Sequence, residues 1–281
     1  MDLGSGGRSP DRTPHPAVLQ AAGRHLKELD RAAPGLVEML YLTGSVALGD
    51  YRHGVSDVDF LAVTSRPPDC SELASLAGIQ EAMRVAPGGS SVAYYDGVYL
   101  DRPSLGSMPD EEQPVPHVVG GEFRADHPCG ELNPVLWWTL VRCGVTVRGP
   151  AATGLGLRPD PARLRRYNLD NLRTYWQPLA GQIRTAVAER APGAPARAEG
   201  VAWAALGAPR LHYTLATGRV TSKSAAAAYV AETFPAWADL AARARSWRAG
   251  EDLPFRSDDA LAAADLVDAV AEDAWWRFGR A

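Results

Sequence analysis

Two pieces of sequence decide the fold, Leu42-Thr43-Gly44-Ser45 and Ser56-Asp57-Val58-Asp59-Phe60-Leu61-Ala62-Val63. The second is a strand pattern in which Asp57 and Asp59 are two positions apart, so their side chains share one face. Two carboxylates on one face repel each other unless a hard divalent cation lies between them, and Mg²⁺ prefers such oxygen ligands. The pair therefore predicts a Mg²⁺ site.

The glycine–serine pair predicts a triphosphate contact. Gly44 allows close approach to the backbone, and the Ser45 hydroxyl with neighbouring N–H groups can donate to phosphate oxygens. The alternative is a strand end with two solvated aspartates after a glycine turn. Gly49, Ser56 and the flanking apolar residues occur in the same stretch and favour the phosphate and metal interpretation.

Composition is that of a protein with a substantial core. The chain has 281 residues, 46% of them hydrophobic and 22% charged, which is enough for one large or two modest domains. No apolar run reaches about 18 residues and the N-terminus lacks the apolar segment of a signal peptide, so we expect a cytoplasmic protein. Three cysteines without paired spacing indicate neither a disulfide framework nor a zinc knuckle: Cys70, Cys129 and Cys143.

The predicted elements divide the chain into two halves. A helix over 15–33, a strand over 37–42, a short helix over 45–48 and the aspartate strand come first. A helix over 71–85 follows, with Ser71 as its cap and Pro87-Gly88-Gly89 as its end.

Residues 91–100 are rich in β-branched and aromatic side chains and predict a strand beside the aspartate strand. Asp96 is the acidic residue of this segment, and a third carboxylate here would reach the metal or an acceptor hydroxyl. The alternative is a turn aspartate in an Asp-Gly hairpin. We favour Asp96 as a site residue.

Residues 101–129 are rich in Pro, Gly and acids and predict irregular structure. A structural loop is favoured over a metal site there, because no ligand pair has helix or knuckle spacing among His117, Glu122, Asp126, His127 and Cys129. A helix over 131–143 and an edge strand over 145–147 precede a break at Gly149-Pro150. Further helices are expected over 161–191, 200–217, 222–233, 237–248 and 258–278.

The expected fold is therefore α+β, with a disordered tail at 1–14, a sheet domain at 15–154 and a helical bundle at 155–281. The run Gly44 to Asp59 resembles the signature of the nucleotidyltransferase superfamily with the DNA polymerase β fold, which transfers a nucleoside monophosphate from an NTP to a hydroxyl. The segment Pro209 to Lys223, with its Tyr213-Thr214-Leu215-Ala216-Thr217-Gly218 turn, resembles bacterial aminoglycoside adenylyltransferases of the streptomycin/spectinomycin class. The likeness extends from Leu42 to Gly250 and includes Trp137 to Pro150.

This resemblance implies a polymerase β-like nucleotidyltransferase domain, a mixed sheet flanked by helices, with a helical bundle that closes the nucleotide and acceptor cleft. It implies that Asp57 and Asp59 ligate Mg²⁺. By the same match, ATP is held by Gly44, Ser45, Ser56, Arg210 and Lys223, the last two offsetting phosphate charge. Read from the residues alone, Arg210 and Lys223 are also compatible with surface helix charges, and Trp247 with either adenine stacking or the core.

Two departures from the family pattern bear on the acceptor. The family commonly has a Glu as the base that accepts the proton of the acceptor hydroxyl, and Asp96 stands at the matching position, one methylene shorter. The Trp and acidic residues that family members use against the antibiotic precede the Arg helix, where this chain has the Ala-, Pro- and Gly-rich segment 191–198. Drug recognition is therefore not implied.

Three functions remain open. The leading one is Mg²⁺-dependent adenylyl transfer from ATP to a small, polar or cationic acceptor by a monomer. An aminoglycoside-like antibiotic is one candidate acceptor, which would give the protein a function in antibiotic resistance. The net charge of −4 and the lack of a long basic cluster disfavour the second, a nucleotidyltransferase acting on protein or nucleic acid. The third is a nucleotide-binding regulator or antitoxin-like module without turnover, which the Asp at position 96 and the segment 191–198 would support.

Overall fold

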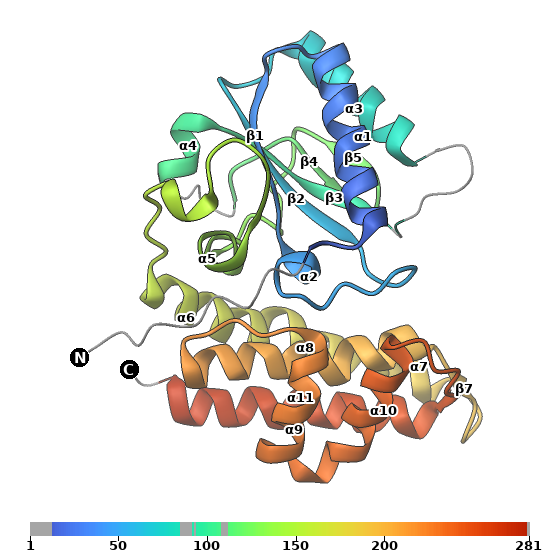
Figure 1. The fold of residues 1–281 in the computed structure, drawn as a ribbon. Coiled ribbons are helices and arrows are strands. Elements are labelled where there is room, and N and C mark those ends of the chain that lie inside the picture. The colour runs from blue at the N-terminus through green and yellow to red at the C-terminus, as the bar shows by residue number, and fades with distance from the viewer. Residues whose placement is uncertain (1–12, 85–91, 93, 108–111, 280–281) are drawn as a thin grey trace.

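A mixed sheet with helices on both faces lies against a group of helices in the computed structural model (Figure 1). The structure describes residues 13–84, 92, 94–107 and 112–279. The expected disordered tail falls almost entirely outside the described residues, as does the Pro87-Gly88-Gly89 end predicted for the helix over 71–85.

The sheet has six strands in the order β5-β4-β3-β2-β1-β6. Their bounds are β1 Val37–Leu42, β2 Val58–Thr64, β3 Tyr95–Asp101, β4 His117–Val119, β5 Glu122–Arg124 and β6 Val145–Arg148. Strands β2 and β3 are parallel, and the remaining neighbours are antiparallel. The α+β fold class with a mixed sheet is confirmed, and the strand predicted over 145–147 is the sheet edge beside β1.

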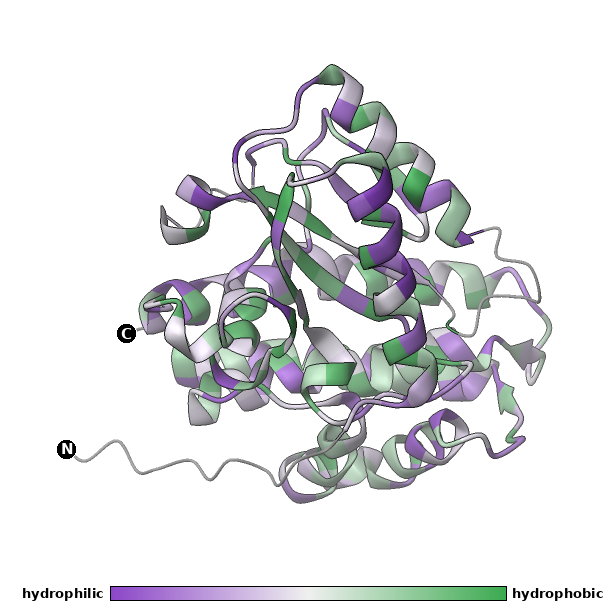
Figure 2. Ribbon diagram, turned by 45° about the horizontal axis from the view of Figure 1, so that its top comes forward, coloured by the Kyte–Doolittle hydropathy of each residue, from purple (hydrophilic) through white to green (hydrophobic). Residues whose placement is uncertain are grey.

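Each face of the sheet is covered by different helices. On one face α1 (Pro16–Ala32) and α3 (Cys70–Arg84) pack onto alternate strand residues such as Leu40 and Phe60. On the other face α4 (Arg102–Ser107) and α5 (Pro134–Cys143) pack onto Tyr41 and Leu61. Both faces are buried, so most residues of β1 and β2 are apolar, and long stretches of the sheet are green in Figure 2.

The remaining elements are mostly helical and have a core of their own. They are α6 (Pro161–Asn171), a π-helical segment η2 (Leu172–Trp176), α7 (Gln177–Ala188), α8 (Ala198–Thr217), α9 (Lys223–Thr233), α10 (Ala238–Arg248) and α11 (Ser257–Phe278). Two 3₁₀ turns, η1 (Ala152–Gly154) and η3 (Pro235–Trp237), complete the connections. Two short strands, β7 (Pro195–Ala196) and β8 (Phe255–Arg256), pair in a segment for which the sequence predicted none.

Residues 101–129 are more regular than predicted. They contain α4 and the β4–β5 hairpin, because Pro and Gly there bound short elements instead of preventing them. His117 is buried in β4, where its Nδ1 lies 2.8 Å from the carbonyl oxygen of Val115.

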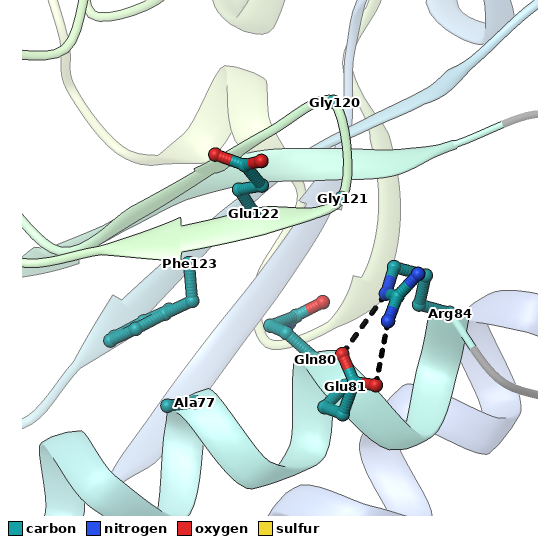
Figure 3. A pocket seen from close by; sticks show the side chains of 8 residues that line it. All are labelled: Ala77, Gln80, Glu81, Arg84, Gly120, Gly121, Glu122 and Phe123. Carbon is teal, nitrogen blue, oxygen red and sulfur yellow. Dashed lines mark hydrogen bonds and ion pairs between the residues drawn. The ribbon is translucent and has the colours of Figure 1, made fainter.

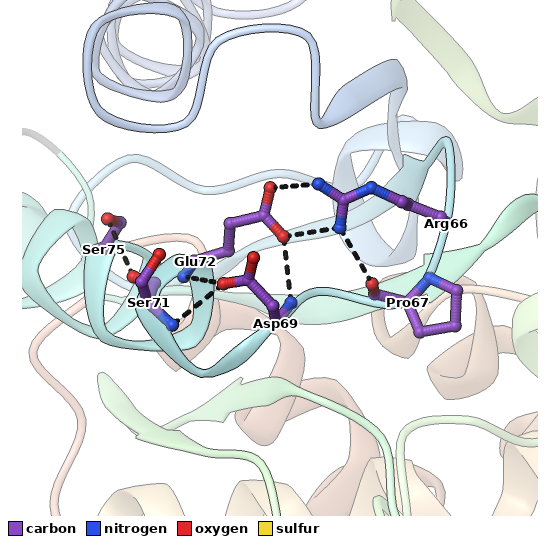
Figure 4. A network of polar contacts seen from close by, with 6 residues as sticks. All are labelled: Arg66, Pro67, Asp69, Ser71, Glu72 and Ser75. Carbon is purple, nitrogen blue, oxygen red and sulfur yellow. Dashed lines mark hydrogen bonds and ion pairs between the residues drawn. The ribbon is translucent and has the colours of Figure 1, made fainter.

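The cap of α3 is also different from the prediction. Asp69 accepts the backbone N–H groups of Ser71 and Glu72, both at 2.9 Å, and Glu72 accepts the N–H of Asp69 in return (Figure 4). Arg66 adds a two-point ion pair to Glu72. The cap is therefore Asp69 and not Ser71, because its carboxylate reaches two free N–H groups at once.

Among the described helices, we find none with the length and apolar character needed to span a membrane.

Candidate active site

The turn between β1 and α2 (Gly44–Ala47) lies directly on the second aspartate. Gly44 has φ +51°, and a Cβ added there would lie 1.7 Å from Oδ2 of Asp59. The N–H of Thr43 donates to the Asp59 carbonyl oxygen at 2.9 Å, and the Ser45 hydroxyl donates to the Asp57 carbonyl oxygen at 3.4 Å. The glycine–serine turn and the two aspartates therefore form one local unit in which position 44 must be glycine.

The strand register brings a third carboxylate to this unit. Asp57 immediately precedes β2, Asp59 lies within it, and Asp59 pairs with Asp96 of the parallel strand β3. All three side chains are half-buried. Asp96 is therefore a strand residue beside the aspartate pair, and the alternative of an Asp-Gly hairpin turn is wrong.

The carboxylate of Asp96 is fixed by the β4–β5 turn. Its Oδ2 accepts the N–H of Gly120 at 2.7 Å and its Oδ1 accepts the N–H of Gly121 at 2.9 Å. Burial raises the pKa of Asp96, and these two N–H groups oppose that rise. Since a carboxylate oxygen has two lone pairs, each oxygen can still accept one more hydrogen bond.

Burial, followed by repulsion among carboxylates, determines the electrostatics of this site. Burial, followed by the charges of Glu131 and Asp57, raises the pKa of Asp59 to about 7. Burial and the charge of Asp96 raise the pKa of Asp57, with a smaller contribution from Glu199. Glu131 and Glu199 are site residues that the sequence reasoning missed, since Glu131 lies in the turn before α5 and Glu199 in the first turn of α8, without a motif around either.

Cations from the helical part face these carboxylates. Lys223 is the first residue of α9, whose N-cap Ser222 accepts the N–H of Ala225 at 3.2 Å. Burial and the charges of Arg210 and Arg248 lower the pKa of Lys223 to about 8, while Asp59 and Asp57 oppose that fall. The predicted residues Arg210 and Lys223 thus lie at one site with Asp57 and Asp59, so neither is a free surface charge.

Ser56 has a role within its own loop. It is 5% exposed, and its Oγ accepts the N–H of Arg52 at 3.0 Å while its own N–H donates to the Arg52 carbonyl oxygen at 2.8 Å. These bonds shape the turn that leads into Asp57. The Ser56 hydroxyl keeps its proton for donation to a further acceptor.

The two aspartates fit a Mg²⁺ ion that takes the rest of its ligands from phosphate and water, which is the usual way proteins bind this ion. In the described part of the chain, no set of three His, Cys, Asp or Glu side chains is arranged to hold a metal by protein ligands alone. The donor set of Asp57 and Asp59 therefore suits a metal that arrives with a nucleotide.

A separate pocket of about 500 Å³ lies between α3 and the β4–β5 turn (Figure 3). Its lining includes Arg84, paired with Glu81 at 2.7 Å, and the glycines 120 and 121 whose N–H groups hold Asp96. None of the predicted site residues lines this pocket.

Comparisons with known proteins agree with this geometry. Residues 23–87 match the nucleotidyltransferase domain family, a range that contains Gly44 to Asp59. The structure is similar to the crystal structure of spectinomycin adenyltransferase AAD(9) from Enterococcus faecialis with ATP and spectinomycin, with a TM-score of 0.65 and 15% identity over 90% of this chain and 98% of that one. No curated protein matches the sequence significantly. The domain match and the shared fold confirm the recognition made from the sequence: the chain contains a nucleotidyltransferase domain and shares the fold of that adenyltransferase structure.

Proposed function

We propose that this chain transfers AMP from ATP to a hydroxyl group of a small, polar or cationic molecule in a Mg²⁺-dependent reaction. The observation that carries the proposal is the meeting of two charge clusters at the domain boundary. The carboxylates of Asp57, Asp59 and Asp96 lie at the N-terminal ends of the central strands β2 and β3, and Lys223 and Arg210 face them from the helices.

The cationic side of this boundary suits the donor. A triphosphate carries several negative charges, and an Arg fork with a Lys ammonium offsets them with directed hydrogen bonds. Gly44, Ser45 and Ser56 would contact the phosphates from the sheet side, where Gly44 leaves the backbone open. The similar adenyltransferase structure contains ATP, which supports ATP as the donor for this chain.

Asp57 and Asp59 would hold the Mg²⁺ ion, which when bound neutralises phosphate charge and orients the phosphates. Asp96 would accept the proton of the acceptor hydroxyl, directly or through water. The acceptor oxygen then bonds to the α-phosphorus, the bond from the α-phosphorus to the bridging oxygen breaks, and pyrophosphate leaves. The two glycine N–H groups hold the Asp96 carboxylate in one orientation for this step.

The acceptor side is acidic and aromatic. Glu199 begins α8 beside Asp57, and Trp203, 37% exposed, stacks on Trp176 with ring centroids 5.5 Å apart. The Lys223 ammonium lies 4.4 Å from the centroid of the Trp203 ring. Acidic and aromatic groups therefore follow the segment 191–198 immediately, and they support a cationic small-molecule acceptor such as an aminocyclitol.

An assay with ATP labelled at the α-phosphate tests the proposal. Purified protein, Mg²⁺ and a panel of aminocyclitols, metabolites, cell protein and nucleic acid are incubated, and the label is followed with pyrophosphate release. We expect label on a small molecule, and a loss of about a thousandfold or more in Asp57→Asn and Asp59→Asn, since metal-ion roles supply several kcal/mol.

Asp126→Asn is the matched control, because the Asp126 side chain is 84% exposed and its ion pair with His127 spans 3.7 Å. Both site variants should keep or raise the melting temperature, since each removes a charge from a repulsive cluster. Near-normal transfer by either would contradict the metal assignment. Label found only on protein or nucleic acid would show that the acceptor is a macromolecule and contradict the small-molecule assignment. ATP binding without metal-dependent pyrophosphate release would contradict catalysis and indicate a nucleotide-binding regulator.

A further inference from the structure

Buried polar atoms without partners gather at the junction of the two parts. Four such atoms in the described residues lie there: the Tyr51 hydroxyl, Nε of Arg210, the Ser224 hydroxyl and Nε of Arg248. A buried polar group without a hydrogen bond costs free energy, and such groups in native proteins call for a specific explanation. This junction therefore has the character of a binding site whose donors are in place.

Arg248 is the most buried charge of this group. It is the last residue of α10 and only 7% of its side chain is exposed. No ion pair within 4.0 Å joins it to an acidic side chain in the part of the chain that the structure describes. A guanidinium is costly to bury in this way unless an anion completes its hydrogen bonds.

The nearby acidic residue Asp50 is already engaged. Asp50 is 5% exposed, its Oδ2 accepts the N–H of Ser224 at 3.1 Å, and its Oδ1 lies 3.8 Å from Arg52. Asp50 therefore does not complete the hydrogen bonds of Arg248, whose Nε has no partner among the described residues, although the charges of Asp50 and Asp57 act on the guanidinium. This unfilled donor lies on the side of the boundary where the nucleotide is proposed to bind.

We propose that Arg248 is a third cationic ligand of the nucleotide triphosphate, beside Arg210 and Lys223. This inference rests on the proposed function and adds to it a residue that neither the sequence motif nor the matched domain contains. The three cations come from three different helices: Arg210 lies within α8, Lys223 begins α9 and Arg248 ends α10. A polyphosphate is the anion that fits, because a single phosphate group carries a charge of only about −2 and would leave three cations partly unneutralised.

Equilibrium binding of two ligands tests the assignment. One is a non-hydrolysable ATP analogue with a methylene group between the α- and β-phosphates, and the other is AMP. We compare wild type with Arg248→Gln, Arg248→Lys and a control, Arg245→Gln. Arg245 is exposed and lies one turn earlier on α10. We expect Arg248→Gln to weaken the analogue at least about tenfold and AMP by less than about threefold, because a charge-assisted hydrogen bond is lost from the polyphosphate. Arg248→Lys should regain part of that loss, and Arg245→Gln should bind within about twofold of wild type.

Thermal unfolding without nucleotide separates this role from a structural one. A ligand-binding Arg248 predicts an unchanged or higher melting temperature in Arg248→Gln, while a structural role predicts a clear fall. Analogue binding by Arg248→Gln within about twofold of wild type would overturn the assignment, and if the Gln variant does not fold, binding by Arg248→Lys within that limit would overturn it instead. Lys223→Gln serves as reference: if it loses binding and Arg248→Gln does not, only the Arg248 assignment fails, whereas a wild type that binds no analogue refutes the donor site itself.

Discussion

The charge of Lys223 makes nucleotide binding depend on pH in the alkaline range. Burial, together with Arg210 and Arg248, lowers its pKa to about 8, against about 10.4 for a free lysine. Below pH 8 the ammonium is protonated and attracts phosphate, and above pH 8 it becomes a neutral amine. The affinity for a triphosphate should therefore fall as the pH rises through 8.

The magnitude follows from the fraction of protonated lysine. If only the protonated form binds, the apparent Kd scales with 1 + 10^(pH − 8), where 8 is the pKa of Lys223. This factor is about 1.1 at pH 7 and about 11 at pH 9, so the affinity should fall about tenfold, or about 1.4 kcal/mol. The arginines of the site remain charged over this range and contribute no such change. Asp59, whose pKa is about 7, loses its proton as the pH rises, so its gain in metal affinity opposes the fall by about twofold at most.

The assay is a calorimetric titration of the protein with the non-hydrolysable ATP analogue, with Mg²⁺ present, at pH 7, 8 and 9. Lys223→Arg is the control, since an arginine keeps its charge and should flatten the dependence. The reasoning is refuted if wild type binds equally well at pH 7 and pH 9, or if Lys223→Arg shows the same tenfold fall.

Three other predictions concern the sheet and the segments packed against it. Gly44→Ala should reduce AMP transfer at least about a hundredfold in the labelled-ATP assay, because its Cβ would lie 1.7 Å from Oδ2 of Asp59; transfer near the wild-type rate would contradict the role of that contact. Asp96→Asn should lose turnover and retain binding of the ATP analogue, and unchanged turnover would eliminate Asp96 as the base. His25 is fully buried with a pKa of about 3, so below about pH 6.5 the unfolded chain binds a proton that the folded one does not, and stability should fall by about 2 kcal/mol between pH 7 and pH 5. Urea unfolding at both pH values should show this fall in the unfolding free energy of wild type and not in that of His25→Gln. If both proteins lose the same stability between pH 7 and pH 5, His25 is excluded as the cause.

Local patterns predicted the sheet side of the site well. The strand over 37–42 has the predicted bounds. Asp57 and Asp59 share one face because side chains alternate along a strand, and the parallel pairing of β2 with β3 places Asp96 beside Asp59. Local sequence patterns do not predict which parts of the helices pack against these three aspartates. Arg248 could not be found from the sequence, since its surroundings are set by the packing of α10 against α8 and α9.

Resemblance and tertiary packing supplied the remaining site residues in different ways. Arg210 and Lys223 were predicted only through a likeness to a family, and the structure brings them to the aspartates. Glu131 and Glu199 were missed because each precedes or opens a helix, where an acidic residue is ordinarily explained by helix capping or the helix dipole. Their effect on Asp59 and Asp57 exists only once distant segments have packed together.

The two charge clusters together explain why a metal–nucleotide complex should bind better than either component. Burial and mutual repulsion raise the pKa values of Asp57 and Asp59, and burial and mutual repulsion lower those of Lys223 and Arg210. Each cluster offsets the pKa shifts of the other only in part, because the pKa values of the carboxyl groups stay raised and those of the cations stay lowered. A metal alone would relieve the carboxylates and add to the positive charge beside Lys223, and a nucleotide alone would do the reverse. The complex brings a cation to one cluster and a polyanion to the other, so the binding of each should strengthen the binding of its partner.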